Sequence, residues 1–102
     1  MIHVLAIITT QPGMRDTALS HFRDNVPAVL AEEGCIEYGA AVDAAPAPAF
    51  QTPCGPDTFV VIEKWASLEA LKAHAAAPHM ASYAAKTREF IASRVLHILS
   101  PA

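Results

Sequence analysis

Residues 59–79 read FVVIEKWASLEALKAHAAAPH, and this stretch decides the fold. It begins as a strand-like apolar run in which Glu63 and Trp65 are two residues apart, so both side chains project from one face of the strand. Directly behind this run the apolar residues change to helical spacing, and the helical segment carries His74 before a proline interrupts it next to His79. The sequence therefore brings a carboxylate, an indole and two imidazoles to one strand–helix junction.

The segments on either side of this junction complete an alternating order of strands and helices. Gly34 ends the first helical pattern, and Pro27 is expected to kink that helix or to split off its last turn. The expected strands are residues 2–9, 35–43, 58–65 and 92–99, and the expected helices are residues 14–33, 67–75 and 78–91. This β-α-β-β-α-β order predicts an α+β, ferredoxin-like domain with its helices on one face of a four-stranded antiparallel sheet.

The other face of this sheet is not expected to contact water. The third strand alternates between two sides that are both mainly apolar, namely Phe59, Val61, Glu63 and Trp65 on one and Val60, Ile62 and Lys64 on the other. The second strand is expected to have Ile36, Tyr38, Ala40 and Val42 on one face. Two such sheets packed face to face would close into a barrel-like homodimer, with a cavity between each sheet and its helices.

The composition limits the function classes that this chain can serve. Its 102 residues are enough for one domain, residues 1–102, and 53% of them are hydrophobic against 17% charged. The net charge of −3 and the scattered lysines and arginines predict no binding of nucleic acid or of an anionic membrane. No apolar run approaches the roughly 20 residues of a membrane span. Cys35 and Cys54 lack metal-ligand spacing, so we expect no metal site and two reduced thiols in a cytoplasmic protein.

Several segments together resemble one known family. They are the N-terminal apolar strand followed by Pro12-Gly13, GCIEY at residues 34–38, FVVIEKW at residues 59–65, and the helix with Leu68, Leu71 and His74 before Pro78-His79. On these segments, which run nearly end to end, the chain resembles the antibiotic biosynthesis monooxygenase family, whose members are small dimeric α+β barrel proteins and include quinol monooxygenases. The most specific part is the Glu63-x-Trp65 step followed by a helix with a histidine before Pro-His.

The resemblance implies an oxygenase that uses no metal, flavin or haem and acts on a small aromatic substrate, such as a quinol or a polyketide-like phenol. A phenol that loses its proton becomes an electron donor able to reduce dioxygen directly. The protein then needs a base near the hydroxyl, an apolar cavity for the ring and a polar group that steadies the peroxide.

Two residues are candidates for the base. Glu63 is a carboxylate in an otherwise apolar strand, so it either pairs with a hydrogen-bond donor or a cation, or has a raised pKa and accepts a proton. His74 lies about 60° round the helix from Leu71, at the edge of the buried side, and a neutral imidazole there could be the base. Its alternative roles are a helix cap or a dimer contact.

Five further residues are candidates for substrate binding, each with a structural alternative. Trp65 either stacks on a planar substrate or anchors the core, and Phe59 lies on the same side of the strand. Tyr38 and Tyr83 either bind a quinol oxygen or pack with their hydroxyls in water. His79, beside a helix break, either contacts substrate or caps the helix.

The proline-rich loop at residues 44–56 departs from the family pattern, in which this hairpin connection is shorter. Loops of this length in compact domains are often lids or partner contacts, or else disordered, and the apolar content around Phe50 favours a lid or a dimer arm.

Two other functions compete with the quinol monooxygenase. Haem-degrading relatives combine a tryptophan and a helical histidine with an asparagine on the first strand, and MIHVLAIITT contains no asparagine. A non-catalytic, ligand-binding or stress-associated dimer predicts a cavity at which no polar groups converge. The enzyme requires Glu63 or His74 to reach a void large enough for an aromatic ring.

Overall fold

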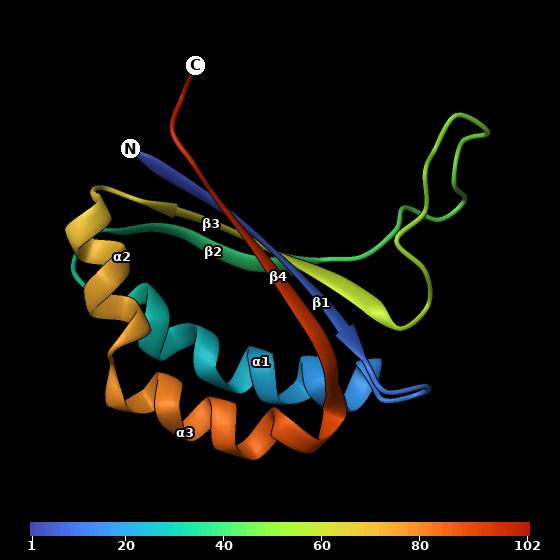
Figure 1. Cartoon of the computed structure of the whole chain (residues 1–102), viewed down its shortest axis with the longest axis horizontal. Helices are drawn as coiled ribbons and strands as arrows, with labels where there is room; N and C mark the ends of the chain where they lie inside the picture. The colour runs from blue at the N-terminus through green and yellow to red at the C-terminus, as the bar shows by residue number, and fades with distance from the viewer.

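The computed structural model describes all residues, 1–102, and has the predicted order of strands and helices (Figure 1). The strands are β1 (Ile2–Thr10), β2 (Cys35–Ala41), β3 (Thr58–Trp65) and β4 (Ile91–Leu99). The helices are α1 (Arg15–Leu30), α2 (Leu68–Ala75) and α3 (Pro78–Thr87), and a short 3₁₀ helix, η1 (Arg88–Phe90), precedes β4. The strands form one antiparallel sheet in the order β2-β3-β1-β4, which confirms the ferredoxin-like α+β fold.

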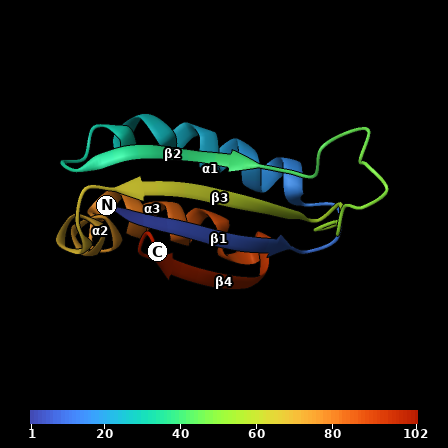
Figure 2. The same ribbon diagram turned by 90° about the horizontal axis from the view of Figure 1, so that it is seen from above.

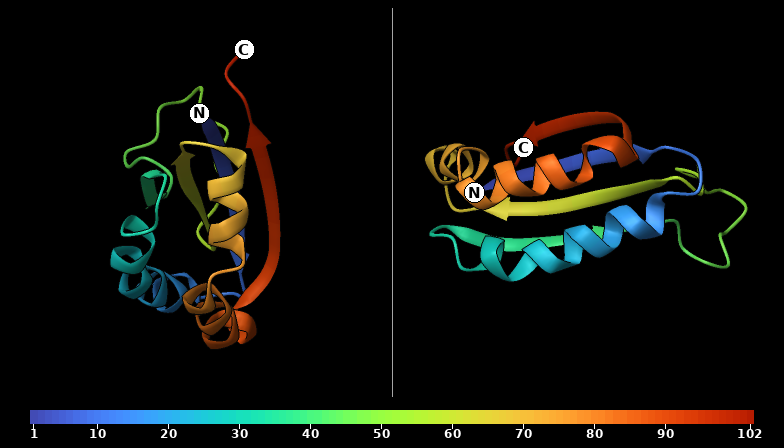
Figure 3. Two further views of the ribbon diagram at one scale, coloured as in Figure 1. Left: turned by 90° about the vertical axis from the view of Figure 1, so that its left-hand side faces the viewer. Right: turned by 90° about the horizontal axis from the view of Figure 1, so that it is seen from below.

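The helices lie on one face of the sheet and leave the other face bare. Figure 2 shows the sheet in front of α1 and α3, and the right-hand view of Figure 3 shows these two helices from their own side. The core lies between the layers, where alternate residues of β1 and β3 meet the apolar stripe of α1; its largest fully buried side chains are Trp65, Phe59, Val4 and Val29. Burying one such side chain contributes about 1.5–3 kcal/mol.

Two local expectations are wrong. α1 continues through Pro27 as one helix to Leu30, so its last turn is not split off; the proline costs the helix a single backbone hydrogen bond, the one to the Arg23 carbonyl. In β2 the register with β3 shifts between Cys35 and Glu37, so Ile36 and Tyr38 do not share an environment. Ile36 is exposed while Tyr38 is buried on the helix side.

The position of His74 is set by the start of α2. The Ser67 side chain accepts a hydrogen bond of 3.1 Å from the Ala70 amide and caps the helix, and Glu69 lies in the first turn. Leu71 and His74 form the buried side of this short helix. α3 then restarts at Pro78, where proline at the first helical position loses no hydrogen bond.

The turn between α1 and β2 approaches α2 closely at Gly34. This residue has a φ of +83°, and a Cβ there would lie 2.6 Å from the Ala70 Cβ. The Gly34 carbonyl also accepts a hydrogen bond of 2.8 Å from the Ala66 amide, at the end of β3. The glycine therefore permits contact between the end of α1 and the helix that carries His74.

The loop of residues 44–56 projects from the sheet at the end opposite to α2 (Figure 1). Asp43 closes its base, because its carboxylate accepts hydrogen bonds from the Cys54 amide, the Gly55 amide and Gln51 Nε2. These backbone donors hold the pKa of Asp43 below its ordinary value. Phe50 at the tip is 91% exposed.

Gly34→Ala is predicted to destabilise the protein more than Gly13→Ala. Both glycines have positive φ, but a Cβ at Gly13 meets nothing within 4 Å. Each alanine costs about 1–2 kcal/mol of backbone strain, and the clash with Ala70 adds about 1–3 kcal/mol at Gly34 alone. Urea denaturation of both variants measures the difference. Equal losses of stability would show that the close approach of the turn to α2 is not needed.

Candidate active site

A cavity of about 580 Å³ lies between the sheet and the two C-terminal helices. Its floor is formed by inward-facing residues of β1 and β3, and its sides are formed by α2, α3 and β4; most of the lining is hydrophobic. The polar and charged side chains that line it are Glu63, His74, Tyr38, Tyr83, Thr87, Arg88 and Arg94. The predicted cavity between sheet and helices is thus present within one chain.

Glu63 is a buried carboxylate on the cavity wall. The residue is 6% exposed, and Oε1 accepts a hydrogen bond of 2.9 Å from Nε1 of Trp65, two positions along the same face of β3. Burial raises the pKa of Glu63 above its ordinary value of 4.5, although the Trp65 hydrogen bond and the positive charges of His74 and Arg94 oppose the rise. Glu63 is thus hydrogen-bonded and also has a raised pKa, and its role as a proton acceptor stays a prediction.

Trp65 and Phe59 lie behind the cavity wall rather than in it. Neither side chain is exposed, and neither lines the cavity. The indole of Trp65 packs against the imidazole of His74, with ring centroids 4.6 Å apart, and the indole N–H donates its hydrogen bond to Glu63. The structure therefore places Trp65 as a core anchor that holds both candidate bases.

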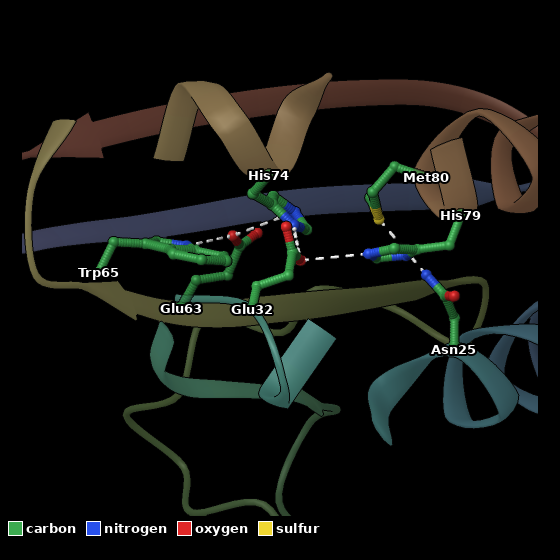
Figure 4. A network of polar contacts seen from close by, with 7 residues as sticks. All are labelled: Asn25, Glu32, Glu63, Trp65, His74, His79 and Met80. Atoms are coloured by element: carbon green, nitrogen blue, oxygen red, sulfur yellow. Dashed lines mark hydrogen bonds and ion pairs between the residues drawn. The ribbon is translucent and has the colours of Figure 1, made fainter. Parts of the chain in front are cut away.

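His74 lies between two carboxylates (Figure 4). Its Nδ1 is 2.7 Å from Glu32 Oε2, and its Nε2 is 3.9 Å from Glu63 Oε1. The residue is 5% exposed, so it is more deeply buried than the helical periodicity indicates, and it lines the cavity. Glu32 is not among the residues predicted from the sequence. It lies 42 residues from His74, just beyond the end of α1, and no helix or strand period links the two positions.

His79 lies beside Glu32, on the side away from Glu63 (Figure 4). Its Nε2 is 3.4 Å from Glu32 Oε2, but neither ring nitrogen makes a hydrogen bond. His79 does not line the cavity, whereas its neighbour Met80 does. Met80 is held by a hydrogen bond of 3.3 Å from Asn25 Nδ2 to its sulfur (Figure 4).

Tyr38 and Tyr83 both line the cavity, as expected of substrate-binding residues. The Tyr38 ring is held by stacking on Phe22, with centroids 5.1 Å apart, and by an edge contact with His74 at 5.5 Å. Burial raises the pKa of both phenols above the ordinary value of 10. Both therefore face the cavity as protonated hydroxyls.

Arg94 is a cavity residue that was not among the candidates. It lies opposite Ile8 in the pairing of β1 with β4, so it points to the helix side of the sheet, and it lines the cavity with Arg88. Its charge acts to lower the pKa of Glu63, Tyr38 and Tyr83. The sequence alone does not fix which residue of β1 pairs with Arg94. Once that pairing with Ile8 is known, the alternation of side chains along β4 places Arg94 on the helix side.

No group of three or more His, Cys, Asp or Glu side chains is arranged to hold a metal ion. The longest helix, α1, has 16 residues, and none of the helices has the length and apolar character needed to cross a bilayer. No residue of the loop at 44–56 lines the cavity, so this loop is not a lid over the cavity of its own chain.

Residues 1–86 match the family model for antibiotic biosynthesis monooxygenases. The chain is also 40% identical over 103 residues to the "Probable quinol monooxygenase YgiN" of Escherichia coli (strain K12), covering 99% of this chain and 98% of that protein. This chain belongs to the antibiotic biosynthesis monooxygenase family. Family membership makes it an oxidoreductase of the monooxygenase class and confirms the resemblance seen in its sequence.

Solved structures of similar chains show the same fold. A structure from Deinococcus radiodurans has a TM-score of 0.82 at 16% identity, covering 100% of this chain and 93% of that chain. One from Nitrosomonas europaea has a TM-score of 0.82 at 16% identity, covering 99% of this chain and 98% of that chain. At these identities the likeness is one of fold alone.

Glu63→Gln is predicted to gain stability relative to the wild type as the pH rises. Because the native pKa of Glu63 lies above the unfolded value of 4.5, the native state binds this proton more tightly. The proton on Glu63 contributes its full stability below pH 4.5, and this contribution is lost as the pH rises through the raised pKa. The loss is about 1.4 kcal/mol for each unit by which the native pKa exceeds the unfolded one. Glutamine keeps an oxygen acceptor for Trp65 but does not titrate.

Urea denaturation of both proteins, from below pH 4.5 to neutral pH, measures this trend. Glu37→Gln, which removes an exposed carboxyl from the neighbouring strand, is the control. A variant that instead loses stability relative to the wild type as the pH rises would show that the pKa of Glu63 is lowered.

Proposed function

We propose that this chain is a monooxygenase that oxidises a quinol, or a similar dihydroxylated aromatic, with molecular oxygen and without a metal, flavin or haem. The observation that carries the proposal is that two proton acceptors, Glu63 and His74, border one mainly apolar cavity. Its volume of about 580 Å³ lies in the range of roughly 300–1,000 Å³ usual for small-molecule sites. The name of the Escherichia coli relative supports the same class of substrate.

The first step that this site supports is removal of a proton from a quinol hydroxyl. His74 Nε2 and Glu63 Oε1 are 3.9 Å apart, which is too long for a hydrogen bond between them. A hydroxyl placed beside this gap comes within reach of both groups. The resulting quinolate is a far better electron donor than the quinol, so it can pass electrons to dioxygen directly.

The overall reaction balances without an external reductant. A quinol and one O₂ give a hydroxylated quinone and one water, so the four electrons that reduce O₂ all come from the ring. One oxygen atom forms the new C–O bond, and the other leaves as water when the O–O bond breaks. The quinol loses two hydroxyl protons and one ring proton; one stays on the new hydroxyl and two leave in water.

Groups that can stabilise the developing negative charge line the same cavity. The phenols of Tyr38 and Tyr83 remain protonated, since burial raises the pKa of each, and they can donate hydrogen bonds to the quinolate or the peroxide. Arg94 brings a positive charge to the same space from β4. The apolar walls hold the ring and limit the access of water.

We also propose that the protein works as a homodimer formed through the bare face of the sheet. The strand registers place four exposed apolar side chains on this face: Leu5, Ile62, Val95 and Leu99. Contiguous exposed apolar surface of this kind marks an interaction site. β4 also exposes Leu96 and Ile98 on its other face, so a second sheet that reaches around β4 would cover both.

The enzyme is predicted to consume oxygen when a hydroquinone is added, and chelator-treated protein is predicted to retain this activity. Glu63→Gln and His74→Gln should each lower kcat by about 10²–10⁴-fold, the usual contribution of a positioned base. An oxygen electrode and a panel of substituted hydroquinones measure both effects. Glu69→Gln, on the exposed first turn of α2, is the matched control and should keep the wild-type rate.

If both Glu63→Gln and His74→Gln retain wild-type rates, these residues are not the base even though the enzyme is real. If no hydroquinone supports oxygen uptake, the substrate class is wrong. Titration with haemin tests the haem alternative, and no shift of the Soret band is expected.

The wild-type protein is predicted to sediment at twice the chain mass of 10.8 kDa, whereas Ile62→Glu should sediment as a single chain. A charge in the middle of the bare face opposes its burial against a second copy. Leu68→Glu makes the same change at an exposed position away from that face and should leave the dimer intact. A wild-type mass of one chain would exclude the dimer.

A further inference from the structure

The contact between Glu32 and His74 is the shortest polar contact at the cavity, and neither the family match nor the proposed reaction explains it. His74 Nδ1 and Glu32 Oε2 are 2.7 Å apart, with the two side chains 6% and 16% exposed. Glu32 lies two residues beyond the end of α1, and its backbone amide donates to the Val29 carbonyl at 3.0 Å. The close turn at Gly34 brings this segment against α2. The contact thus depends on the end of α1, the turn at Gly34 and α2.

This contact selects one tautomer of His74. An ionised carboxylate can only accept hydrogen bonds, so Nδ1 must carry the hydrogen that Glu32 receives. In the neutral ring the lone pair is then on Nε2. That nitrogen is the one that faces Glu63 at the cavity wall.

We propose that Glu32 is a positioning residue that holds His74 as the Nδ1–H tautomer, with Nε2 free to accept the substrate proton. The inference rests on the proposed function. When the O–H bond of the quinol breaks, its proton forms a new N–H bond at His74 Nε2, and the electron pair stays on the quinolate oxygen. The ring becomes an imidazolium whose Nδ1–H is still bound by the Glu32 carboxylate. Nε2 later returns this proton to the leaving peroxide oxygen; a second of the three protons lost by the quinol completes the water as the O–O bond breaks.

The distances indicate that Glu32, rather than Glu63, is the carboxylate that holds the His74 ring. A buried imidazolium needs a nearby negative charge, and Glu32 supplies it at hydrogen-bond distance while Glu63 is more than an ångström farther away. The other titratable groups around the pair are Tyr38 and Cys35 from β2, His79 and Tyr83 from α3, and Arg94 from β4. Burial and the charges of Glu32 and Glu63 raise the pKa of the Cys35 thiol, so the electrostatic effect of both carboxylates extends to β2.

His79 lies against Glu32 on the side away from Glu63 (Figure 4). Its Nε2 is 3.4 Å from the same oxygen that His74 uses, without the alignment of a hydrogen bond. Its side chain is more exposed than either partner of the short contact, at 28%. The ring of His79 therefore limits access of water to Glu32, which strengthens the bond between Glu32 and His74.

The purely structural alternative is that Glu32 only joins the end of α1 to α2. In that case its loss would lower stability but would not change which nitrogen of His74 carries the hydrogen. The two roles are therefore separated by a measurement on the ring itself. Correlation of ring protons with ¹⁵N in protein labelled at histidine distinguishes the tautomers, and His74→Gln identifies the signal.

In ligand-free wild-type protein, neutral His74 is expected to be protonated at Nδ1 and unprotonated at Nε2. Glu32→Gln should lose this single tautomer, because an amide can either donate or accept, while Glu33→Gln, at an exposed neighbouring position, should keep it. Glu32→Asp retains the charge and is expected to preserve the tautomer. A wild-type His74 protonated at Nε2 would overturn the proposal with no variant needed.

Oxygen uptake then tests the consequence for catalysis. Glu32→Gln should lower kcat at least about tenfold with little change in KM; an analogous exchange in a Ser-His-Asp triad costs about 10⁴-fold. Glu32→Asp should recover part of the loss. A Glu32→Gln enzyme that turns over like the wild type would overturn the role. Absence of uptake by the wild type with every hydroquinone contradicts the proposed function instead, and the tautomer measurement still decides whether Glu32 orients His74.

Discussion

The hydrogen bond from the Trp65 indole to the Glu63 carboxylate is the interaction on which the rest of the site depends. A carboxylate that is 6% exposed in an apolar strand needs a donor, and the strand periodicity supplies one two residues away on the same face. Because Trp65 is fully buried, its position is fixed by the core, and it fixes Glu63 in turn. The same indole supports the ring of His74 at 4.6 Å. One core residue thus orients both candidate bases.

The electrostatic arrangement follows from this placement. His74 has a carboxylate near each of its ring nitrogens, at 2.7 Å on one side and 3.9 Å on the other. The two carboxylates, Glu63 buried and Glu32 half-buried, would also repel the negative charge of a nearby quinolate. Arg94 and the two phenols lie where they can offset that opposition. The site is therefore asymmetric, with the two carboxylates beside His74 and the positive charge of Arg94 on β4.

Much of the fold could be predicted from the sequence because its signals are local. The strand and helix periodicities of residues 59–79, with Gly34 and Pro78 at helix boundaries, set the element order. Glu63 and Trp65 share one face of β3 as the strand period predicts, whereas His74 is more deeply buried than the helical period indicates. The features that the sequence did not predict depend on pairing between distant segments. The bulge that exposes Ile36 and the register that turns Arg94 inward are properties of neighbouring strands. Glu32 meets His74 across 42 residues, through a turn whose geometry no single period describes.

The carboxylate of Asp43 has a consequence for how this chain can vary. By accepting hydrogen bonds from the Gly55 and Cys54 amides, it ties the two sides of the loop together just beyond the end of β2. The segment from residue 44 to residue 53 is therefore outside the closed hairpin, and its length is uncoupled from the register of β2 and β3. Insertions or deletions there alter how far Phe50 reaches from the sheet, while the strand that carries Glu63 keeps its alignment. The loop is the part of the protein that can diverge without cost to the chemistry at the other end.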